Sequence, residues 1–130
     1  MSQPLKRILY VEDEPDIRQI ATFSLKAVGG FEVCPCSSGE EALREGPDFK
    51  PDLLLLDVMM PAMDGLQTLE AARAHPVLAA VPVVFMTAKA QEADMTVYDR
   101  VGALGVIAKP CQATRLPERV RALWEGRHGG

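Results

Sequence analysis

The chain has 130 residues, of which 48% are hydrophobic and 25% are charged, a composition typical of one ordinary globular domain. Its longest apolar runs are too short to cross a bilayer, and its N-terminus lacks the apolar core of a signal peptide. We therefore expect a cytoplasmic protein with no membrane partner. The net charge of −4, without a block of basic residues, argues against nucleic-acid binding by this chain.

The cysteines are Cys34, Cys36 and Cys111. An odd number of cysteines in a chain without a secretory signal argues against a disulfide framework. No histidine lies near them in the sequence to complete a zinc site. We interpret them as small hydrophobic residues, buried or half-buried.

Apolar runs with the length of strands recur along the chain. They are Ile8–Val11, Phe31–Cys34, Leu53–Leu56, Val83–Met86 and Leu104–Ile107. Three of these runs are nearly continuous rather than alternating. Continuous apolar runs of this length are typical of strands that helices cover on both faces of the sheet.

Helical patterns separate these strands. The first has Pro15 in its first turn and ends at Gly29, and its apolar residues follow a 3.6-residue period. The periodic residues are Ile17, Ile20, Ala21, Ser24, Leu25 and Val28. Ser38 and Glu41 have the spacing of a capping box that opens a second helix, and Asp64 can cap a third.

A fourth helix is predicted between Gln91 and Val101, and we expect Thr114 to cap a fifth. The inner side of the fifth helix would carry Leu116, Val120, Leu123 and Trp124. Pro117 lacks a backbone N–H, so we expect this helix to start late or to hold Pro117 in its first turn.

Strands that alternate with helices call for a parallel sheet with right-handed crossovers. We therefore predict an α/β fold with a doubly wound five-stranded parallel sheet. One domain would cover residues 1–125, followed over 126–130 by a disordered tail or the start of a linker.

Polar residues follow several of the predicted strands, at the sheet edge where open α/β sheets bind ligands. They are Glu12, Asp13 and Glu14 after the first strand, Ser37 and Ser38 after the second, Asp57 after the third, Thr87 after the fourth and Lys109 after the fifth. We assign Glu14 to the start of the first helix, where a negative charge is favourable. The others would meet at one edge.

Such a cluster of acids needs a counter-charge. Two carboxylates about 5 Å apart repel by roughly 3 kcal/mol at an effective dielectric of 20. The Lys109 ammonium and a divalent cation can supply the positive charge, and a few hard oxygen ligands suit Mg²⁺. A carboxylate beside Mg²⁺, the Thr87 hydroxyl and a lysine is equipped for phosphoryl transfer through an aspartyl-phosphate on Asp57.

Motifs around these residues are shared with a known family. They are Ile8-Leu9-Tyr10-Val11-Glu12-Asp13-Glu14, Leu56-Asp57-Val58-Met59-Met60-Pro61 with Asp64-Gly65, Met86-Thr87-Ala88, Gly102-Ala103 and Lys109-Pro110. In this order and at this spacing, over about residues 6–125, the chain resembles the response regulator receiver domains of two-component signalling. It is similar in size to the single-domain chemotaxis regulator of that family.

The resemblance implies a set of roles. Asp57 would be the phosphoacceptor, Thr87 the switch hydroxyl and Lys109 the lysine that pairs with the phosphate. Mg²⁺ would be held by Asp13 directly, by Glu12 through water, by Asp57 and by the backbone carbonyl of Met59.

The resemblance also implies partners and a topology. A histidine kinase or a phosphotransfer protein would donate the phosphoryl group, and phosphorylation would change binding to a downstream protein. The fold would be a flavodoxin-like three-layer sandwich with strand order 2-1-3-4-5, and the bond before Pro110 would be cis.

One position departs from the family pattern. Receivers often have Tyr or Phe three residues before the lysine, as a side chain that changes rotamer with the switch hydroxyl, and here that residue is Val106. A valine has no ring to move between exposed and buried positions. Tyr98, on the predicted fourth helix, is another candidate to report phosphorylation, and its ordinary interpretation is a surface or helix-packing tyrosine.

Two alternatives use related chemistry or the same fold. A Mg²⁺-dependent phosphatase of the haloacid-dehalogenase type also forms an aspartyl-phosphate, but it expects an aspartate where this chain has Met59, and it usually carries a cap domain. A flavodoxin-like cofactor binder needs a loop rich in Ser, Thr or Gly after the first strand. The acidic loop that begins at Glu12 would instead repel a phosphate.

Overall fold

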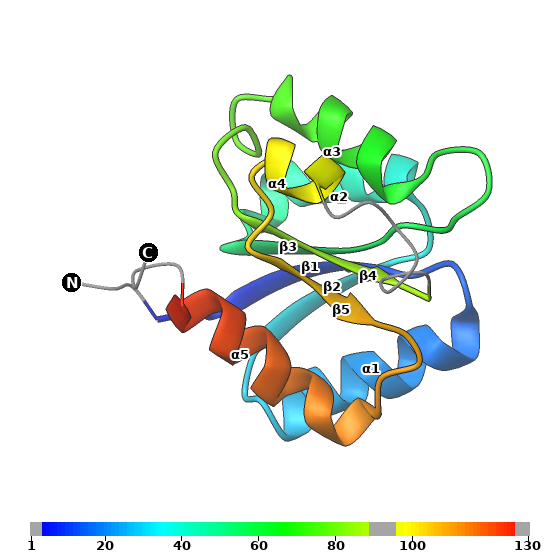
Figure 1. Cartoon of the computed structure of the whole chain (residues 1–130), viewed down its shortest axis with the longest axis vertical. Coiled ribbons are helices and arrows are strands. Elements are labelled where there is room, and N and C mark those ends of the chain that lie inside the picture. Colours follow the sequence, from blue (N-terminus) through cyan, green and yellow to red (C-terminus); the bar gives the residue numbers. More distant parts are fainter. Residues whose placement is uncertain (1–3, 89–95, 127–130) are drawn as a thin grey trace.

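The computed structural model describes residues 4–88 and 96–126, and its strands form one parallel sheet with the order β2-β1-β3-β4-β5 (Figure 1). The strands are β1 (Arg7–Val11), β2 (Glu32–Cys36), β3 (Leu53–Asp57), β4 (Val83–Thr87) and β5 (Gly105–Ala108). Each overlaps a predicted apolar run, and the predicted strand order is confirmed. The topology is the flavodoxin-like one expected from the sequence.

Helices cover both faces of this sheet and complete three layers. They are α1 (Pro15–Ala27), α2 (Gly39–Phe49), α3 (Gly65–Arg73), α4 (Thr96–Arg100) and α5 (Leu116–Gly126), with a 3₁₀ turn, η1 (Ala113–Arg115), before α5. α1 and α5 lie on one face, and α2, α3 and α4 lie on the other (Figure 1). No helix in the described part of the chain is long and apolar enough to span a membrane.

The sheet is buried on both faces, which explains the continuous apolar runs. Successive side chains of a strand point to opposite faces, so each strand contributes to two cores. Tyr10 and Leu55 pack on the side of α1 and α5, whereas Leu9 and Leu54 pack on the side of α2 and α3. Because all of the strand pairs are parallel, the carboxyl ends of the strands lie at the same edge of the sheet.

Two predicted caps hold their helices in slightly different ways. Asp64 accepts a hydrogen bond from the Gln67 N–H at 2.8 Å, and the Gln67 side chain accepts one from the Asp64 N–H at 3.0 Å, a complete capping box. At α2 the Ser38 hydroxyl accepts from the Glu41 N–H at 3.0 Å. The Glu41 carboxylate, however, accepts from the N–H of Ser37 rather than from that of Ser38.

Helix α5 corrects one expectation and confirms another. Thr114 lies inside the 3₁₀ turn, so it is not the cap that we predicted. The extra turn moves the start of the helix to Leu116 and leaves Pro117 in the first turn, as expected from its missing donor. Gln91, where the fourth helix was expected to begin, lies outside the described residues, as does 127–130 of the predicted tail; Gly126 still belongs to α5.

The periodic residues of α1 do not share one environment. Ala21, Ser24 and Leu25 are buried, but Ile17, Ile20 and Val28 are exposed by 43%, 59% and 64%. The apolar stripe is wider than the contact that the sheet and α5 provide, so its margins stay on the surface. The cysteines are free, with Cys36 buried and Cys34 and Cys111 half-buried, as expected for small hydrophobic residues.

Candidate functional site

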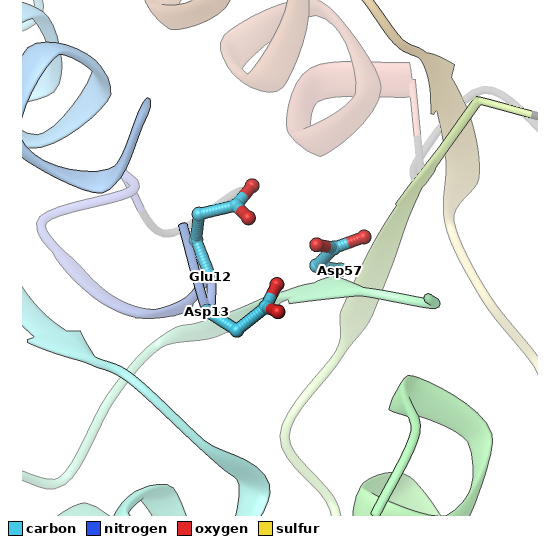
Figure 2. A group of neighbouring side chains, drawn as sticks. All are labelled: Glu12, Asp13 and Asp57. Atoms are coloured by element: carbon cyan, nitrogen blue, oxygen red, sulfur yellow. The ribbon is translucent and has the colours of Figure 1, made fainter. Parts of the chain in front are cut away.

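Three carboxylates meet at the carboxyl edge of the sheet. Strands β1 and β3 are neighbours, and Val11 pairs with Leu56, so the residues that follow them emerge side by side. Glu12, Asp13 and Asp57 each offer an oxygen, and these oxygens all lie within 4.8 Å of one another. Figure 2 shows the side chains from the two strand ends gathered around one space. The structure therefore brings together the acids that the sequence predicted.

Lys109 reaches the same cluster from β5. Its ammonium Nζ lies 2.8 Å from Glu12 Oε1 and 3.2 Å from Asp57 Oδ2. The backbone positions it, because the Lys109 N–H donates to the Thr87 carbonyl at 2.9 Å and extends the pairing of β4 with β5. The bond between Lys109 and Pro110 is cis, as expected. One ammonium thus neutralises part of the charge on two buried acids.

Burial and mutual repulsion set the protonation of these acids. Glu12 is fully buried and Asp57 is 2% exposed. Burial alone would raise the pKa of Glu12, but its bonds to Lys109 and to the Glu14 N–H lower that pKa below its ordinary value. Burial, followed by the Glu12 charge, raises the pKa of Asp57 to about 7. Without a metal, the pKa of Asp57 therefore lies close to neutral pH.

Backbone and side-chain donors fix the orientation of the acids. The Met59 N–H donates to Asp57 Oδ1 at 3.2 Å. The Arg18 guanidinium of α1 donates to the Glu12 carbonyl at 2.8 Å and so braces the acidic loop against the helix. Arg18 was not among the predicted site residues. The available signal was its place near the start of the helix that follows this loop.

Gly65 allows α3 to start directly beside Asp57. A Cβ atom on Gly65 would lie 2.6 Å from the Asp57 carbonyl oxygen, closer than a side chain can approach a backbone atom. The Gly65 N–H also donates to the Val58 carbonyl at 3.1 Å. The Asp64-Gly65 motif therefore combines a helix cap with a close backbone contact.

The other predicted residues of this edge are Thr87, Met59 and Ser38. Thr87 ends β4, at the carboxyl edge of the sheet, and is buried. The Met59 side chain is 55% exposed beside the site. Ser38 serves the cap of α2.

The flank of the sheet formed by β4, β5 and α4 contains Val106, the residue that stands where many receivers have Tyr or Phe. Phe85 pairs with Val106 in the sheet register. The Tyr98 ring of α4 is buried and packs on Phe85, with ring centroids 5.2 Å apart. Tyr98 is therefore a helix-packing residue, in agreement with its ordinary interpretation.

The donor set fits a small divalent cation. Three carboxylates are hard oxygen ligands, and Lys109 balances only part of their charge. Mg²⁺ favours a few carboxylates and keeps several positions for water or phosphate oxygens. The cluster of Glu12, Asp13 and Asp57 is typical of a Mg²⁺ site.

Sequence comparison assigns nearly the whole chain to one family model, described as response regulator receiver domain, which matches residues 8–121. The chain is 35% identical over 118 residues to the alkaline phosphatase synthesis transcriptional regulatory protein PhoP of Bacillus subtilis, covering 91% of this chain and 48% of that protein. It is 35% identical over 117 residues to the DNA-binding response regulator MtrA of Mycobacterium tuberculosis, covering 90% of this chain and 50% of that protein. The chain thus spans about half the length of these relatives.

Solved structures show the same fold. The chemotaxis protein CheY4 of Vibrio cholerae superposes with a TM-score of 0.82 at 27% identity, covering 92% of this chain and 98% of that chain. The similarity therefore extends over the full length of a protein of comparable size.

Proposed function

Because the chain belongs to the family of response regulator receiver domains, we propose that Asp57 is the residue that accepts its phosphoryl group. A receiver domain is a phosphoacceptor of two-component signalling rather than an enzyme with turnover, so the phosphatase and flavin alternatives have no support from the comparisons. The observation that supports Asp57 is its joint contact with Lys109 and the neighbouring acids. Asp57 is the last residue of β3, and its carboxylate accepts a hydrogen bond from the Met59 N–H.

The family pattern suggests how the acids divide the metal ligation. We propose that Asp13, Asp57 and the Met59 carbonyl bind Mg²⁺ directly and that Glu12 acts through water. Glu12 is fully buried, and its two carboxylate oxygens accept hydrogen bonds from Lys109 at 2.8 Å and from the Glu14 N–H at 3.2 Å. Bound Mg²⁺ would neutralise oxygens of the incoming phosphoryl group.

The residues of this chain then have separate tasks in the transfer. A carboxylate oxygen of Asp57 attacks the phosphorus of a phosphohistidine on the donor, so a P–O bond forms as the P–N bond breaks. The leaving imidazole takes up a proton from solvent. Lys109 is positioned to pair with one phosphoryl oxygen and the Thr87 hydroxyl to donate to another, which stabilises charge that develops on the group.

The partners follow from the family. Receiver domains imply a histidine kinase as donor. We propose that a phosphotransfer protein could serve in its place and that phosphorylation changes the binding of a downstream protein. Residues 1–125 would form the receiver unit.

Acetyl phosphate tests the assignment without a protein donor. Wild type, Asp57→Asn and Asp48→Asn are incubated with acetyl phosphate and Mg²⁺, and phosphorylation is followed by intact mass. Asp48 is exposed on α2 and serves as the matched control. We expect wild type and Asp48→Asn to gain one phosphoryl group, and Asp57→Asn and samples with EDTA to gain none. Equal labelling of Asp57→Asn and wild type would refute the assignment.

A further inference from the structure

A cavity of about 320 Å³ opens beside the acidic cluster, between α1 and the segment that follows β5. Its walls include Tyr10, Ile17, Ile20, Lys109, Cys111 and Leu116. We call it the α1–β5 pocket. Ligand sites commonly have volumes of about 300–1,000 Å³, with mostly apolar walls and a few placed polar groups. The pocket meets this description.

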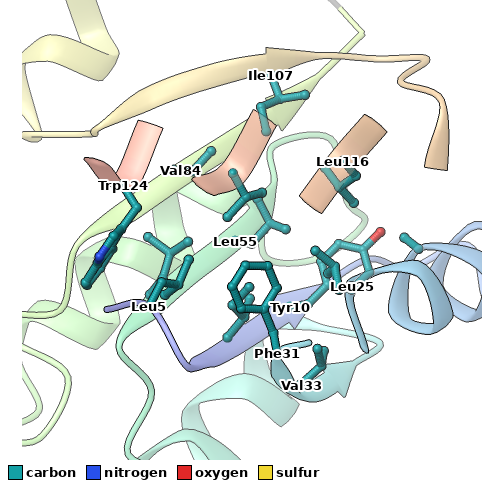
Figure 3. Packing of buried hydrophobic residues seen from close by; sticks show 14 of the residues in the cluster. Leu5, Tyr10, Leu25, Phe31, Val33, Leu55, Val84, Ile107, Leu116 and Trp124 are labelled. Atoms are coloured by element: carbon teal, nitrogen blue, oxygen red, sulfur yellow. The ribbon is translucent and has the colours of Figure 1, made fainter. Parts of the chain in front are cut away.

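Tyr10 provides the polar group at its floor. The side chain is fully buried on β1, and in the described part of the chain its hydroxyl has no hydrogen-bond partner. In Figure 3 the hydroxyl is the red atom, which lies toward Leu116 and α1. A buried hydroxyl without a partner costs about 1–3 kcal/mol. An acceptor supplied at this floor would recover that free energy.

The entrance has side chains that can adjust. Ile17 and Ile20 are 43% and 59% exposed, so they can change rotamer without disturbing the sheet. Changes of side-chain rotamer are common when ligands and partners bind. Access to the Tyr10 hydroxyl therefore does not require the core to open.

The surrounding charge selects the class of ligand. A tyrosine hydroxyl is protonated at neutral pH, so the Tyr10 hydroxyl can donate. The charges of Glu12 and Asp57 act on this position and disfavour an anion at the floor. Lys109 does not compensate fully, since it already contacts both acids.

We propose that the α1–β5 pocket binds a small neutral molecule with an apolar body and one hydrogen-bond acceptor, to which the Tyr10 hydroxyl donates a hydrogen bond. Lys109 belongs both to this pocket and to the acidic cluster, so the two sites share a side chain. A ligand in the pocket would therefore contact Lys109, which also contacts Asp57, and could change the phosphorylation of Asp57. This consequence rests on the proposed function. Binding itself does not depend on Asp57 chemistry.

Two probes of similar shape test the hydrogen bond. Acetophenone has a phenyl ring and a carbonyl acceptor, and ethylbenzene lacks the acceptor. Each is titrated into the full chain without phosphodonor, and binding is followed by amide shifts in NMR spectra. The variants are Tyr10→Phe, which removes only the hydroxyl, and Tyr98→Phe, which removes a hydroxyl on the opposite face of the sheet.

We expect acetophenone to bind Tyr10→Phe about five- to tenfold more weakly than wild type, with no change for Tyr98→Phe. Ethylbenzene should bind wild type and Tyr10→Phe alike. Ala113→Leu, which adds bulk to the pocket wall, should weaken both probes. Amide shifts at Ile17, Ile20 and Cys111 should report the site.

The proposal is overturned if neither probe binds, or if acetophenone binds wild type and Tyr10→Phe equally. If neither probe binds and Tyr10→Phe slows phosphotransfer from a protein donor, the pocket receives a side chain of that partner instead of a small molecule. These outcomes differ from a failure of Asp57 to be phosphorylated, which acetyl phosphate labelling detects separately.

Discussion

The carboxyl edge of β1 and β3 and the flank formed by β4, β5 and α4 lie next to each other but are stabilised by different forces. At the edge, Lys109 pairs with two buried acids and backbone N–H groups orient them. At the flank, Phe85, Tyr98 and Val106 make apolar and aromatic contacts. Substitutions can therefore test the edge and the flank separately.

Lys109→Met should produce the largest effect, because it leaves Glu12 and Asp57 buried without their counter-charge. We expect a loss of about 3–5 kcal/mol in the free energy of unfolding without metal, measured by urea titration. Lys26→Met, at an exposed lysine of α1, is the control and should be close to wild type. Equal stability of the two variants would mean that the edge does not depend on the ion pair.

Tyr98→Ala tests the flank. Removing a buried ring from its contact with Phe85 should cost about 3 kcal/mol in the free energy of unfolding. The rate of labelling by acetyl phosphate should stay within about twofold of wild type, because no acid or donor of the edge has changed. A parallel loss of labelling rate in fully folded protein would show that edge and flank are not separable.

Asp57→Asn should stabilise the metal-free domain in a pH-dependent way. Asp57 has an ordinary pKa of 3.8 and a folded pKa of about 7, so the folded state binds more protons than the unfolded state between those values. The contribution of Asp57 to the free energy of unfolding of the wild-type protein should therefore fall as pH rises from about 4 to about 7.

We expect Asp57→Asn to exceed wild type by about 1–3 kcal/mol above neutral pH and by much less at about pH 4. Thermal unfolding in EDTA across this range measures the difference. A difference that is constant with pH, or that grows toward acid, would contradict the assigned environment of Asp57.

Arg18→Ala should have the smallest effect. Its guanidinium braces the acidic loop through the Glu12 carbonyl, and loss of this bond should cost about 1 kcal/mol of stability. Mg²⁺ affinity, measured by NMR titration, should fall severalfold. Arg44→Ala, at an exposed arginine of α2, should change neither quantity. If both variants retain wild-type affinity, the brace does not position the metal ligands.

The sequence predicted the edge better than the flank, and the reason is physical. Parallel strands deliver the residues that follow them to one edge, so Asp57 and Lys109 could be placed together from strand ends alone. Their contacts depend on topology, and alternating strands and helices fix that topology.

Contacts between helices and the sheet were harder to predict, because they depend on how each helix is rotated and how side chains fill the space. Three features have this origin: the exposure of Ile17 and Ile20, the hydrogen bond from Arg18, and the packing of Tyr98 against Phe85. Periodicity identifies α1 as a helix but does not say how wide a stripe its neighbours cover.

Mapping the phosphoryl group by tandem mass spectrometry tests the central claim most directly. Wild-type protein is labelled with acetyl phosphate and Mg²⁺, digested under mild acid and sequenced by fragmentation. The proposed function predicts a single phosphoryl group on Asp57, absent when EDTA is present. A phosphoryl group on Asp13, on His75 or on any other residue would contradict it.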